Sequence, residues 1–560
     1  MRDGQLVACV EEERFTRQKH TGDFPAAAIR HCVREAGITA GELDNVCYYW
    51  NPLLSLPRQA WYIARNMPRS LQLVRSRQNR YFPMFRVKQR VWRELGLTRA
   101  DKAKFHFINH HLAHAASAFY PSPFDDAAIL TLDAAGEWTT TWLGRGRGTE
   151  LKAIREISFP HSLGMLYGAV TEHLGFKFSS GEGKVMGLAS YGKPDLVDEF
   201  RKLVDIDEES GDFRLDLSYF DWHVKGRGKW VSDKFRRIFG PEREPESGIE
   251  ERHANIAYAL QAVTEEAGLS LARYLHRVTG AENICLAGGV ALNAVMNGRI
   301  LDEGPFKRVF IQPAANDPGT SVGACLLMHV KNGGGRDFRM EHAYWGPSYS
   351  NEDIERELKA SGVTYNRVED APAEAARLLA ADRIVAWFQG RMECGPRALG
   401  NRSILSDPRT ADKKDILNAR VKHRESFRPF APSVLEEKVR ECFDSDHPSP
   451  YMILVYNVLP DRKHELEAIT HVDGTARVQT VSRRVNERYY RLIEEFERLT
   501  GVPVVLNTSF NVRGQPIVNT PAEAVECYLG TGIDALVIGD FVTVKEPEPG
   551  AVGGPGGGRQ

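Results

Sequence analysis

Three features that would assign this chain of 560 residues to a specialised class are absent. No apolar run approaches the length of a membrane-spanning helix and no charged-then-apolar leader opens the chain, which predicts a cytoplasmic protein without a membrane span. Basic and acidic residues balance at 73 and 74, so nucleic acid is not expected as a partner. The eight cysteines contain no C-x-x-C pair, which argues against a disulfide framework and a structural zinc knuckle.

The length exceeds what one hydrophobic core supports, so two or more domains are expected. Short apolar runs bounded by turn residues alternate with stretches of helical period, which predicts an α/β fold. The clearest predicted strands are residues 127–132, 283–287, 309–312 and 385–388. Three helices are predicted most clearly. One begins at His110, and the other two cover residues 250–279 and 351–361.

The run His110-His-Leu-Ala-His114 predicts a metal site. Residues four apart on a helix share a face, so both imidazoles can reach one point. Asp133 closes one predicted strand, and Asp317 lies in the turn expected after another, where a side chain commonly faces a ligand cleft. Two histidines and two aspartates suit iron, manganese or zinc. The alternative is that the histidines are core or interface groups that only make hydrogen bonds, which is the interpretation for His111 on the other face.

Dense glycine marks two loops, residues 181–192 and 288–293. Glycine lets the backbone approach a ligand closely. The second loop joins a strand to a helix start, which suits a nucleotide phosphate or sugar. Turns need glycine for their own geometry as well, so both interpretations stay open.

Arginines recur on glycine turns at strand ends in the last third of the chain, beside amide and hydroxyl side chains. A guanidinium binds phosphate or carboxylate through paired N–H groups. One such arginine would be a surface charge, whereas a succession of them favours capture of an anionic ligand. The arginines lie in residues 395–403, 422–429 and 475–479, and residues 507–511 supply amide and hydroxyl side chains.

The first ten residues predict a hairpin whose partner strand is missing. Asp3-Gly4 is a strong turn signal and residues 5–10 have the pattern of the strand after it, but only two residues precede the turn. The polar loop of residues 11–20 follows. It either holds a nucleotide or is a solvated run of charges.

Residues 58–104 form a basic strip, with thirteen Lys or Arg against Glu94 and Asp101 and with interleaved aromatic residues. The pattern predicts basic amphipathic helices inserted into the domain. Such a strip would attract an anionic acceptor substrate or, less readily, a membrane surface. The alternative is a solvated face whose side-chain stems pack on the aromatic rings.

Seven motifs carry a family resemblance: HHLAHAASAFY, SLGMLYGAVTEHLGF, GEGKVMGLASYGKP, LAGGVALN, NDPGTSVGA, CGPRALGNRSIL and NTSFNVRGQPIV. Together and in this order they resemble the O-carbamoyltransferases of antibiotic and nodulation-factor biosynthesis, the nebramycin 5′ synthase-like family. The resemblance extends from Glu11 to Gly539.

The resemblance implies two domains, and the Pro/Gly-rich composition after them predicts a tail. Residues 1–340 are expected to form an actin/sugar-kinase-like domain, a duplicated ribonuclease-H-like fold whose first strand is lacking here. Residues 341–545 are expected to form an α/β domain resembling carbamoyl-adenylate-forming tRNA-modification enzymes, and residues 546–560 a disordered tail. In the family, the C-terminal domain converts carbamoyl phosphate and ATP into carbamoyl-adenylate. The N-terminal domain then gives the carbamoyl group to a hydroxyl of a specialised metabolite or glycoside at a metal site.

The resemblance also implies roles for individual positions. The metal ligands, which are also the catalytic residues, are His110, His114, Asp133 and Asp317. The carbamoyl-phosphate site consists of Arg397, Lys422 and Arg428. The neighbouring nucleotide contacts are Arg477, Asn507 and Ser509. The nucleotide site of the N-terminal domain consists of Lys19, Gly136, Gly288, Gly289 and Asn293.

The implied cofactors are a divalent metal, with iron favoured, and ATP and carbamoyl phosphate as co-substrates. The implied partners are a small-molecule hydroxyl acceptor and a second copy of the chain in a homodimer. Members of the family carry a further strand and a His-Asp-Ser-type loop before the present Met1, and in relatives that loop helps to bind the nucleotide or acceptor. Two interpretations stay open: the chain is impaired in that binding, or the sequence is an incomplete record of an active enzyme. Two other functions fit parts of the sequence: a tRNA threonylcarbamoyl-adenosine-type enzyme, which the balanced charge disfavours, and a non-catalytic nucleotide-dependent scaffold.

Overall fold

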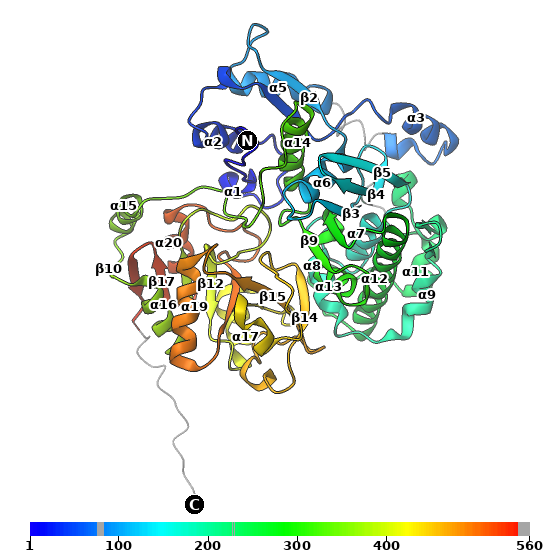
Figure 1. The fold of residues 1–560 in the computed structure, drawn as a ribbon. Helices are drawn as coiled ribbons and strands as arrows, with labels where there is room; N and C mark the ends of the chain where they lie inside the picture. Colours follow the sequence, from blue (N-terminus) through cyan, green and yellow to red (C-terminus); the bar gives the residue numbers. More distant parts are fainter. Residues whose placement is uncertain (75–82, 227, 229, 547–560) are drawn as a thin grey trace, which may run out of the picture.

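The computed structural model describes residues 1–74, 83–226, 228 and 230–546. It contains two lobes, each built on a β-sheet flanked by helices (Figure 1). The predicted α/β fold class is therefore confirmed. The predicted disordered tail lies outside the described residues apart from Glu546, and so does the part of the basic strip from residue 75 to 82.

The N-terminal lobe is centred on a five-stranded sheet in the order β5-β4-β3-β8-β9. β3 pairs antiparallel with β4 and parallel with β8, β5 is antiparallel to β4, and β9 is parallel to β8. Three antiparallel strands followed by two parallel ones is the order of a ribonuclease-H-like unit, as predicted. The strands are β3 (Asp126–Leu132), β4 (Thr139–Arg147), β5 (Glu150–Ser158), β8 (Asn283–Ala287) and β9 (Arg308–Ile311).

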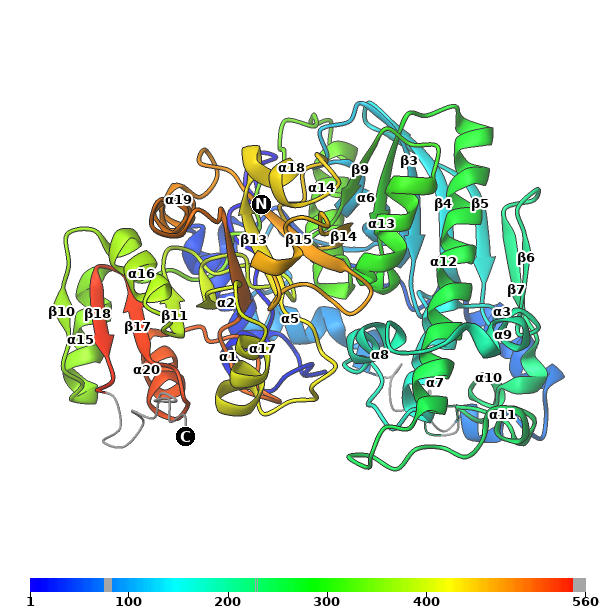
Figure 2. The ribbon, with the colours of Figure 1, turned by 90° about the horizontal axis from the view of Figure 1, so that it is seen from below.

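Two helices pack against each other beside this sheet, α6 (His110–Phe119) and α14 (Asp317–Lys331). α6 contacts β3 and β8, and α14 contacts a small parallel sheet of β1 (Asn45–Tyr48) and β2 (Lys104–Phe107). The long helix α12 (Glu251–Thr279) contacts β3, and four α-helices contact α12 in turn (Figure 2). These four are α7 (Leu163–His173), α8 (Glu182–Ala189), α9 (Val197–Arg201) and α13 (Ala294–Glu303).

The C-terminal lobe contains a mixed nine-stranded sheet in the order β10-β18-β17-β11-β12-β16-β13-β15-β14. Its strands are β10 (Asn366–Arg367), β11 (Val385–Phe388), β12 (Arg402–Ser406), β13 (Ala431–Leu435), β14 (Leu454–Asn457), β15 (Thr475–Val481), β16 (Val504–Ser509), β17 (Ala535–Ile538) and β18 (Phe541–Val544). Its longer helices are α15 (Asn351–Ser361), α16 (Ala371–Ala380), α19 (Glu487–Thr500) and α20 (Pro521–Leu529).

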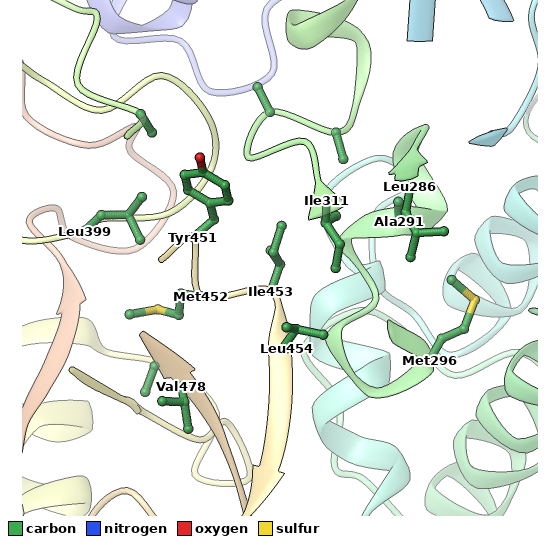
Figure 3. Packing of buried hydrophobic residues seen from close by; sticks show 14 of the residues in the cluster. Leu286, Ala291, Met296, Ile311, Leu399, Tyr451, Met452, Ile453, Leu454 and Val478 are labelled. Atoms are coloured by element: carbon green, nitrogen blue, oxygen red, sulfur yellow. The ribbon is translucent and has the colours of Figure 1, made fainter. Parts of the chain in front are cut away.

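The two lobes share one buried apolar cluster. Figure 3 shows Ile453 and Leu454, at the start of β14, beside Ile311 and Ala291 of the N-terminal lobe. The Asn297 side chain on α13 donates a hydrogen bond across the boundary to the Ile453 carbonyl at 3.0 Å. Continuous apolar packing across the boundary holds the two sheets in one arrangement, which gives a site between them a defined shape.

Most predicted helices and strands are confirmed, but four predicted segments are wrong. The glycine-rich loop of residues 181–192 is mostly helix α8, and the polar loop of residues 11–20 contains the short helix α1 (Glu13–Thr16). Residues 5–10 form no strand, because the chain has no neighbour there to pair with: the Arg391 guanidinium donates to the Val7 carbonyl and the Cys9 N–H donates to the C-terminal lobe at Trp345. The preceding turn does form, with an isolated bridge between Arg2 and Gln5. The predicted turn at residues 316–321 is instead the first turn of α14, in which Pro318 is tolerated because an N–H there has no intrahelical partner.

One disulfide, between Cys9 and Cys394, joins the N-terminal segment to the C-terminal lobe. The scattered cysteines did not predict it, because the two residues are 385 positions apart and only the fold brings them together. The other six cysteines are free. In the described part of the chain, no helix combines the length and the apolar character needed to span a bilayer.

Candidate metal centre and arginine pocket

The two predicted histidines meet at the start of α6. Asn109 caps this helix, its side chain accepting a hydrogen bond from the Leu112 N–H at 2.9 Å. His110 and His114 then lie one turn apart, both fully buried, with 3.2 Å between their Nε2 atoms. His111 points elsewhere and bonds the Thr131 hydroxyl at 2.6 Å, as expected of a core polar group.

Asp133 follows β3 and reaches the imidazoles from the sheet. Its Oδ2 lies 3.0 Å from His110 Nε2 and 3.7 Å from His114 Nε2, and its Oδ1 accepts the Gly289 N–H at 3.1 Å. Gly288 permits the hydrogen bond between the Gly289 N–H and Asp133. Its φ is 91°, which residues with side chains rarely adopt, and a Cβ at this position would overlap the Leu132 carbonyl. The glycine pair therefore fixes the distance between the ends of β3 and β8.

Asp317 approaches from α14, which packs unusually closely on α6. A Cβ on Gly323 would overlap the Ala113 carbonyl oxygen, so only glycine permits this crossing. As a result Asp317 Oδ1 lies 3.8 Å from His110 Nε2. The Asp317 side chain is 56% exposed, so it forms the open side of an otherwise buried group.

One donor atom from each of these four residues lies within 4.8 Å of the others. We call His110, His114, Asp133 and Asp317 the donor cluster. Burial alone would raise the pKa of Asp133, but hydrogen bonds to His110 and His114 hold it well below the usual value. Burial lowers the pKa of His114. At His110 burial also opposes the charged form, but the hydrogen bond to Asp133 and the charge of Asp317 outweigh it and raise the pKa. A carboxylate anion beside a neutral imidazole is the protonation state in which both bind metal ions.

Glu137 supports this cluster and was missed by the sequence reasoning. Its carboxylate accepts the His110 N–H at 3.2 Å, the Asn51 N–H at 2.8 Å and the Asn109 amide at 3.2 Å. A carboxylate is favourable at a helix N-terminus, where the backbone N–H groups are unpaired. Glu137 lies only four residues after Asp133 in the sequence. This spacing points to a supporting role only once the structure shows that α6 begins beside it.

Four arginines line a second region, in the C-terminal lobe. We call Arg397, Arg424, Arg428 and Arg477 the arginine pocket. Burial, then the neighbouring Arg428 charge, lowers the pKa of Arg397 to about 10; burial and Arg428 lower that of Arg424 to about 9. Among the described residues no carboxylate lies within 4.0 Å of any of these four guanidiniums. The charge of Glu425 offsets part of the repulsion at Arg424 and Arg428. Four crowded cations with so little counter-charge are costly, and an anionic ligand would relieve that cost.

The loop carrying Arg397 is held by a buried carboxylate. One oxygen of Glu393 accepts the N–H groups of Leu399 at 2.7 Å and Asn401 at 2.9 Å, which closes the loop around it. Arg477 instead projects from β15. Because both supports are rigid, the guanidiniums are positioned before a ligand arrives.

The other predicted residues of the C-terminal lobe divide into two groups. Asn507 and Ser509, on β16, line the same cavity; the Asn507 amide donates to Gln479 at 3.0 Å and the Ser509 hydroxyl to Asn511 at 2.6 Å. Lys422 does not line it. Its ammonium donates to the carbonyls of Ser509 and Asn511, so it fixes the end of β16 from behind.

The predicted N-terminal nucleotide residues also separate. Lys19 lies nearer the arginine pocket: burial lowers its pKa, and the charges of Arg428 and Arg397 contribute to the lowering. Gly136 and Gly289 line the cavity beside the donor cluster. Asn293 lines it too and donates to Gln261 at 2.9 Å, whereas Gly288 acts through the backbone contact described above.

A single cavity of about 1990 Å³ is lined by both sets of residues. Asp133 and Asp317 lie on its wall in the N-terminal lobe, and the four arginines on its wall in the C-terminal lobe. The donor cluster, through its two aspartates, and the arginine pocket therefore face one common cavity.

Comparison with known families decides the identity. The carbamoyltransferase N-terminus family matches residues 1–326, and the carbamoyltransferase C-terminus family matches residues 376–545. The chain belongs to the carbamoyltransferase family. The resemblance expected from the seven motifs is thus confirmed, and this carbamoyltransferase is an enzyme of that class.

Individual relatives agree with this assignment. The carbamoyltransferase is 38% identical to the nodulation protein NolNO of Sinorhizobium fredii, over 97% of this chain and 78% of that protein. It is 40% identical to the nodulation protein NolO of Bradyrhizobium diazoefficiens, over 79% of each chain. It is 44% identical to the protein sll1178 of Synechocystis sp., over 98% of this chain and 95% of that one.

Proposed function

We propose that this carbamoyltransferase is an ATP-dependent O-carbamoyltransferase that uses carbamoyl phosphate, forms carbamoyl-adenylate and carbamoylates a hydroxyl of a specialised metabolite or glycoside. The observation that carries the proposal is the common cavity of the arginine pocket and the donor cluster. A mixed anhydride is hydrolysed readily, so a common cavity that joins activation to transfer shortens its exposure to bulk water. We assign activation to residues 341–545 and transfer to residues 1–340.

The arginine pocket suits the activation step. Carbamoyl phosphate is a small dianion, and guanidiniums that lack a carboxylate partner offer it charge-assisted hydrogen bonds. Its cleavage by water gives carbamate and phosphate. A carbamate oxygen then bonds to the α-phosphorus of ATP while the bond to the β-phosphate breaks, which yields carbamoyl-adenylate and pyrophosphate. The pocket cations would stabilise the negative charge that shifts to the leaving groups.

The donor cluster fits a divalent metal ion such as iron, manganese or zinc. Ligands about 2.1 Å from a shared ion lie roughly 3–4 Å from one another, and the spacings of 3.0 Å and 3.8 Å around His110 Nε2 fall in that range. Bound there, the ion would supply a Lewis acid for the carbamoyl oxygen. The chain's own residues hold its place: His110, His114 and Asp133 from buried elements, and Asp317 from the cavity side.

Product analysis tests the proposed reaction. With carbamoyl phosphate, ATP and a panel of hydroxyl acceptors, we expect a product heavier by one carbamoyl group, with AMP and pyrophosphate formed in equal amounts. The acceptor hydroxyl bonds to the carbamoyl carbon, AMP leaves, and the hydroxyl proton is released. Mass spectrometry of the acceptor and chromatography of the nucleotides measure both sides. Formation of ADP and a phosphorylated acceptor would instead establish a kinase.

Replacing Glu137 by glutamine should weaken metal binding without unfolding the enzyme. The Glu137 carboxylate accepts N–H groups of His110, Asn51 and Asn109 through two oxygens, whereas a glutamine amide has only one oxygen that can accept. The start of α6 and the His110 imidazole therefore lose their fixed position. Residues that orient metal ligands typically contribute about 10–100-fold in affinity. Titration of the metal-free enzyme with Mn²⁺ or Zn²⁺ measures the change.

A matched control is Glu156→Gln on the same sheet. Within the described part of the chain, this carboxylate accepts a side-chain hydrogen bond from the Thr139 hydroxyl alone, at 2.8 Å. We expect unchanged metal affinity in that variant. Equal affinities for the Glu137→Gln variant and the unmodified enzyme would show that Glu137 does not position His110.

A further inference from the structure

Helix α3 (Leu56–Arg65) lies at one edge of the N-terminal lobe (Figure 1). Exposed apolar side chains are concentrated in and around this helix. Eighteen large apolar side chains are exposed in the described part of the chain, and six of them fall within the 19 residues from 53 to 71. Scattered exposed apolar residues are ordinary, but such a concentration marks a contact surface. We call this the α3 surface; its six apolar residues are Leu53, Leu54, Leu56, Trp61, Met67 and Leu71.

The helix is oriented with its polar side inward. Gln59 is buried and donates to the Ser55 hydroxyl at 2.6 Å. Tyr62 is buried too, its hydroxyl 2.8 Å from His223 Nδ1 and its ring edge-on to Phe159. The same helix leaves Trp61 60% exposed. Because these internal contacts already hold the helix, packing within the lobe does not account for the apolar residues on its outer side.

The charge of the α3 surface is of one sign. Arg58 and Arg65 are exposed on it, and residues 51–74 contain no aspartate or glutamate. Arg69 is exposed too, although its guanidinium lies 3.9 Å from the largely buried Asp221 carboxylate. The Arg65 guanidinium lies over the Trp61 ring, 5.2 Å from its centroid. A short helix with Leu and Trp on its outer side and arginine as its only charge is typical of segments that lie in the interface of an anionic bilayer.

We infer that the α3 surface docks this carbamoyltransferase onto an anionic lipid bilayer. The apolar side chains enter the boundary between head groups and acyl chains, and the arginines bind the lipid phosphates. A typical protein surface carries charges of both signs, so binding to it would not favour a surface with positive charge alone. A bilayer that contains anionic lipid is negative throughout and complements the whole α3 surface.

The docking surface borders the donor cluster. The Ser55 hydroxyl donates to the Glu137 carbonyl at 2.9 Å, and the Asn51 N–H donates to the Glu137 carboxylate at 2.8 Å. The carboxylate of Glu137 in turn accepts the His110 N–H. Docking would therefore hold the N-terminal lobe with its donor cluster close to the membrane plane.

Vesicle sedimentation tests the inference. We expect the enzyme to sediment with vesicles of phosphatidylglycerol and phosphatidylcholine, to bind pure phosphatidylcholine vesicles at least ten-fold more weakly, and to be partly released by 0.5 M NaCl. The double variant Leu54→Glu/Trp61→Glu should lose at least ten-fold in partitioning. The control Leu499→Glu/Leu529→Glu adds the same two negative charges at exposed leucines of the C-terminal lobe. We expect this control to bind vesicles as well as the unmodified enzyme.

A second variant separates charge from folding. Arg58→Gln/Arg65→Gln changes only exposed side chains, and we expect it to keep its melting temperature while losing the preference for phosphatidylglycerol. Failure of the unmodified enzyme to sediment with anionic vesicles would overturn the inference. A second result would also overturn it. If light scattering showed that Leu54→Glu/Trp61→Glu converts a dimer into a monomer while vesicle binding stays unchanged, the α3 surface would be an interface between two copies of the chain.

Discussion

The Arg397→Ala variant is expected to lose about 10²–10³-fold in kcat/KM for carbamoyl phosphate. Arg397 sits on a loop closed around the Glu393 carboxylate and has no carboxylate partner of its own among the described residues. Its N–H groups are thus free to form paired bonds with a phosphate or carbamate. Pyrophosphate release that depends on carbamoyl phosphate measures the loss, and ATP binding should persist.

The same substitution should not destabilise the ligand-free enzyme. The arginine pocket holds four cations close together, and the charge of Arg428 contributes to lowering the pKa of Arg397. Removing one of several crowded like charges reduces their repulsion. We therefore expect the variant to melt at or above the temperature of the unmodified enzyme. Lower activity with equal or higher stability is a trade-off typical of residues retained for function.

Two further variants sharpen the experiment. Arg397→Lys keeps the charge but loses the planar fork, so it should recover only part of the activity if paired hydrogen bonds matter. Arg440→Ala removes an exposed arginine of the same lobe, which pairs with Asp446 on the surface, and should behave like the unmodified enzyme. Full turnover in Arg397→Ala would refute the role of the pocket and favour a non-catalytic nucleotide-dependent scaffold.

Local sequence patterns were enough to predict three of the four residues of the donor cluster. The spacing of His110 and His114 requires only a helix, and the position of Asp133 requires only the end of a buried strand. Asp317 was placed correctly but for an incomplete reason. It begins a helix, and its approach to His110 depends on Gly323 meeting the Ala113 backbone, which no local pattern reports.

Long-range contacts explain the parts that sequence reasoning did not reach. Glu137 acts on α6 from a loop 27 residues away, and its role depends on where the sheet carries that loop. Lys422 belongs to an arginine-rich segment by sequence, yet its ammonium turns to the carbonyls behind β16. Residues 5–10 have the alternation of a strand, but a strand forms only where a neighbour offers its backbone.

The largest effect on the transfer step is expected from the donor cluster. In His114→Ala the bound metal should fall well below one ion per chain, because one of four donors is lost and the remaining imidazole no longer has a partner at 3.2 Å. His114 is fully buried, so truncation also costs about 2–3 kcal/mol of stability from lost packing. Elemental analysis measures the metal, and circular dichroism checks the fold.

Asp317→Asn separates metal binding from packing. Its side chain is 56% exposed, so the substitution removes a charge and a ligand without leaving a cavity. We expect weaker metal binding, a fall of about 10²–10³-fold in carbamoyl transfer, and an unchanged melting temperature. Asp125→Asn, at a surface aspartate that is 91% exposed, is the matched control.

The two sites should fail independently. Asp317→Asn should still release pyrophosphate when carbamoyl phosphate and ATP are supplied, because the arginine pocket is intact; Arg397→Ala should still bind its metal, because the donor cluster is intact. A mixture of the two variants should not recover the activity, since the unstable intermediate forms in one chain and the working transfer site lies in another. Recovery at the level of the unmodified enzyme would show that the intermediate leaves the cavity, and the common cavity would then not be the route of transfer.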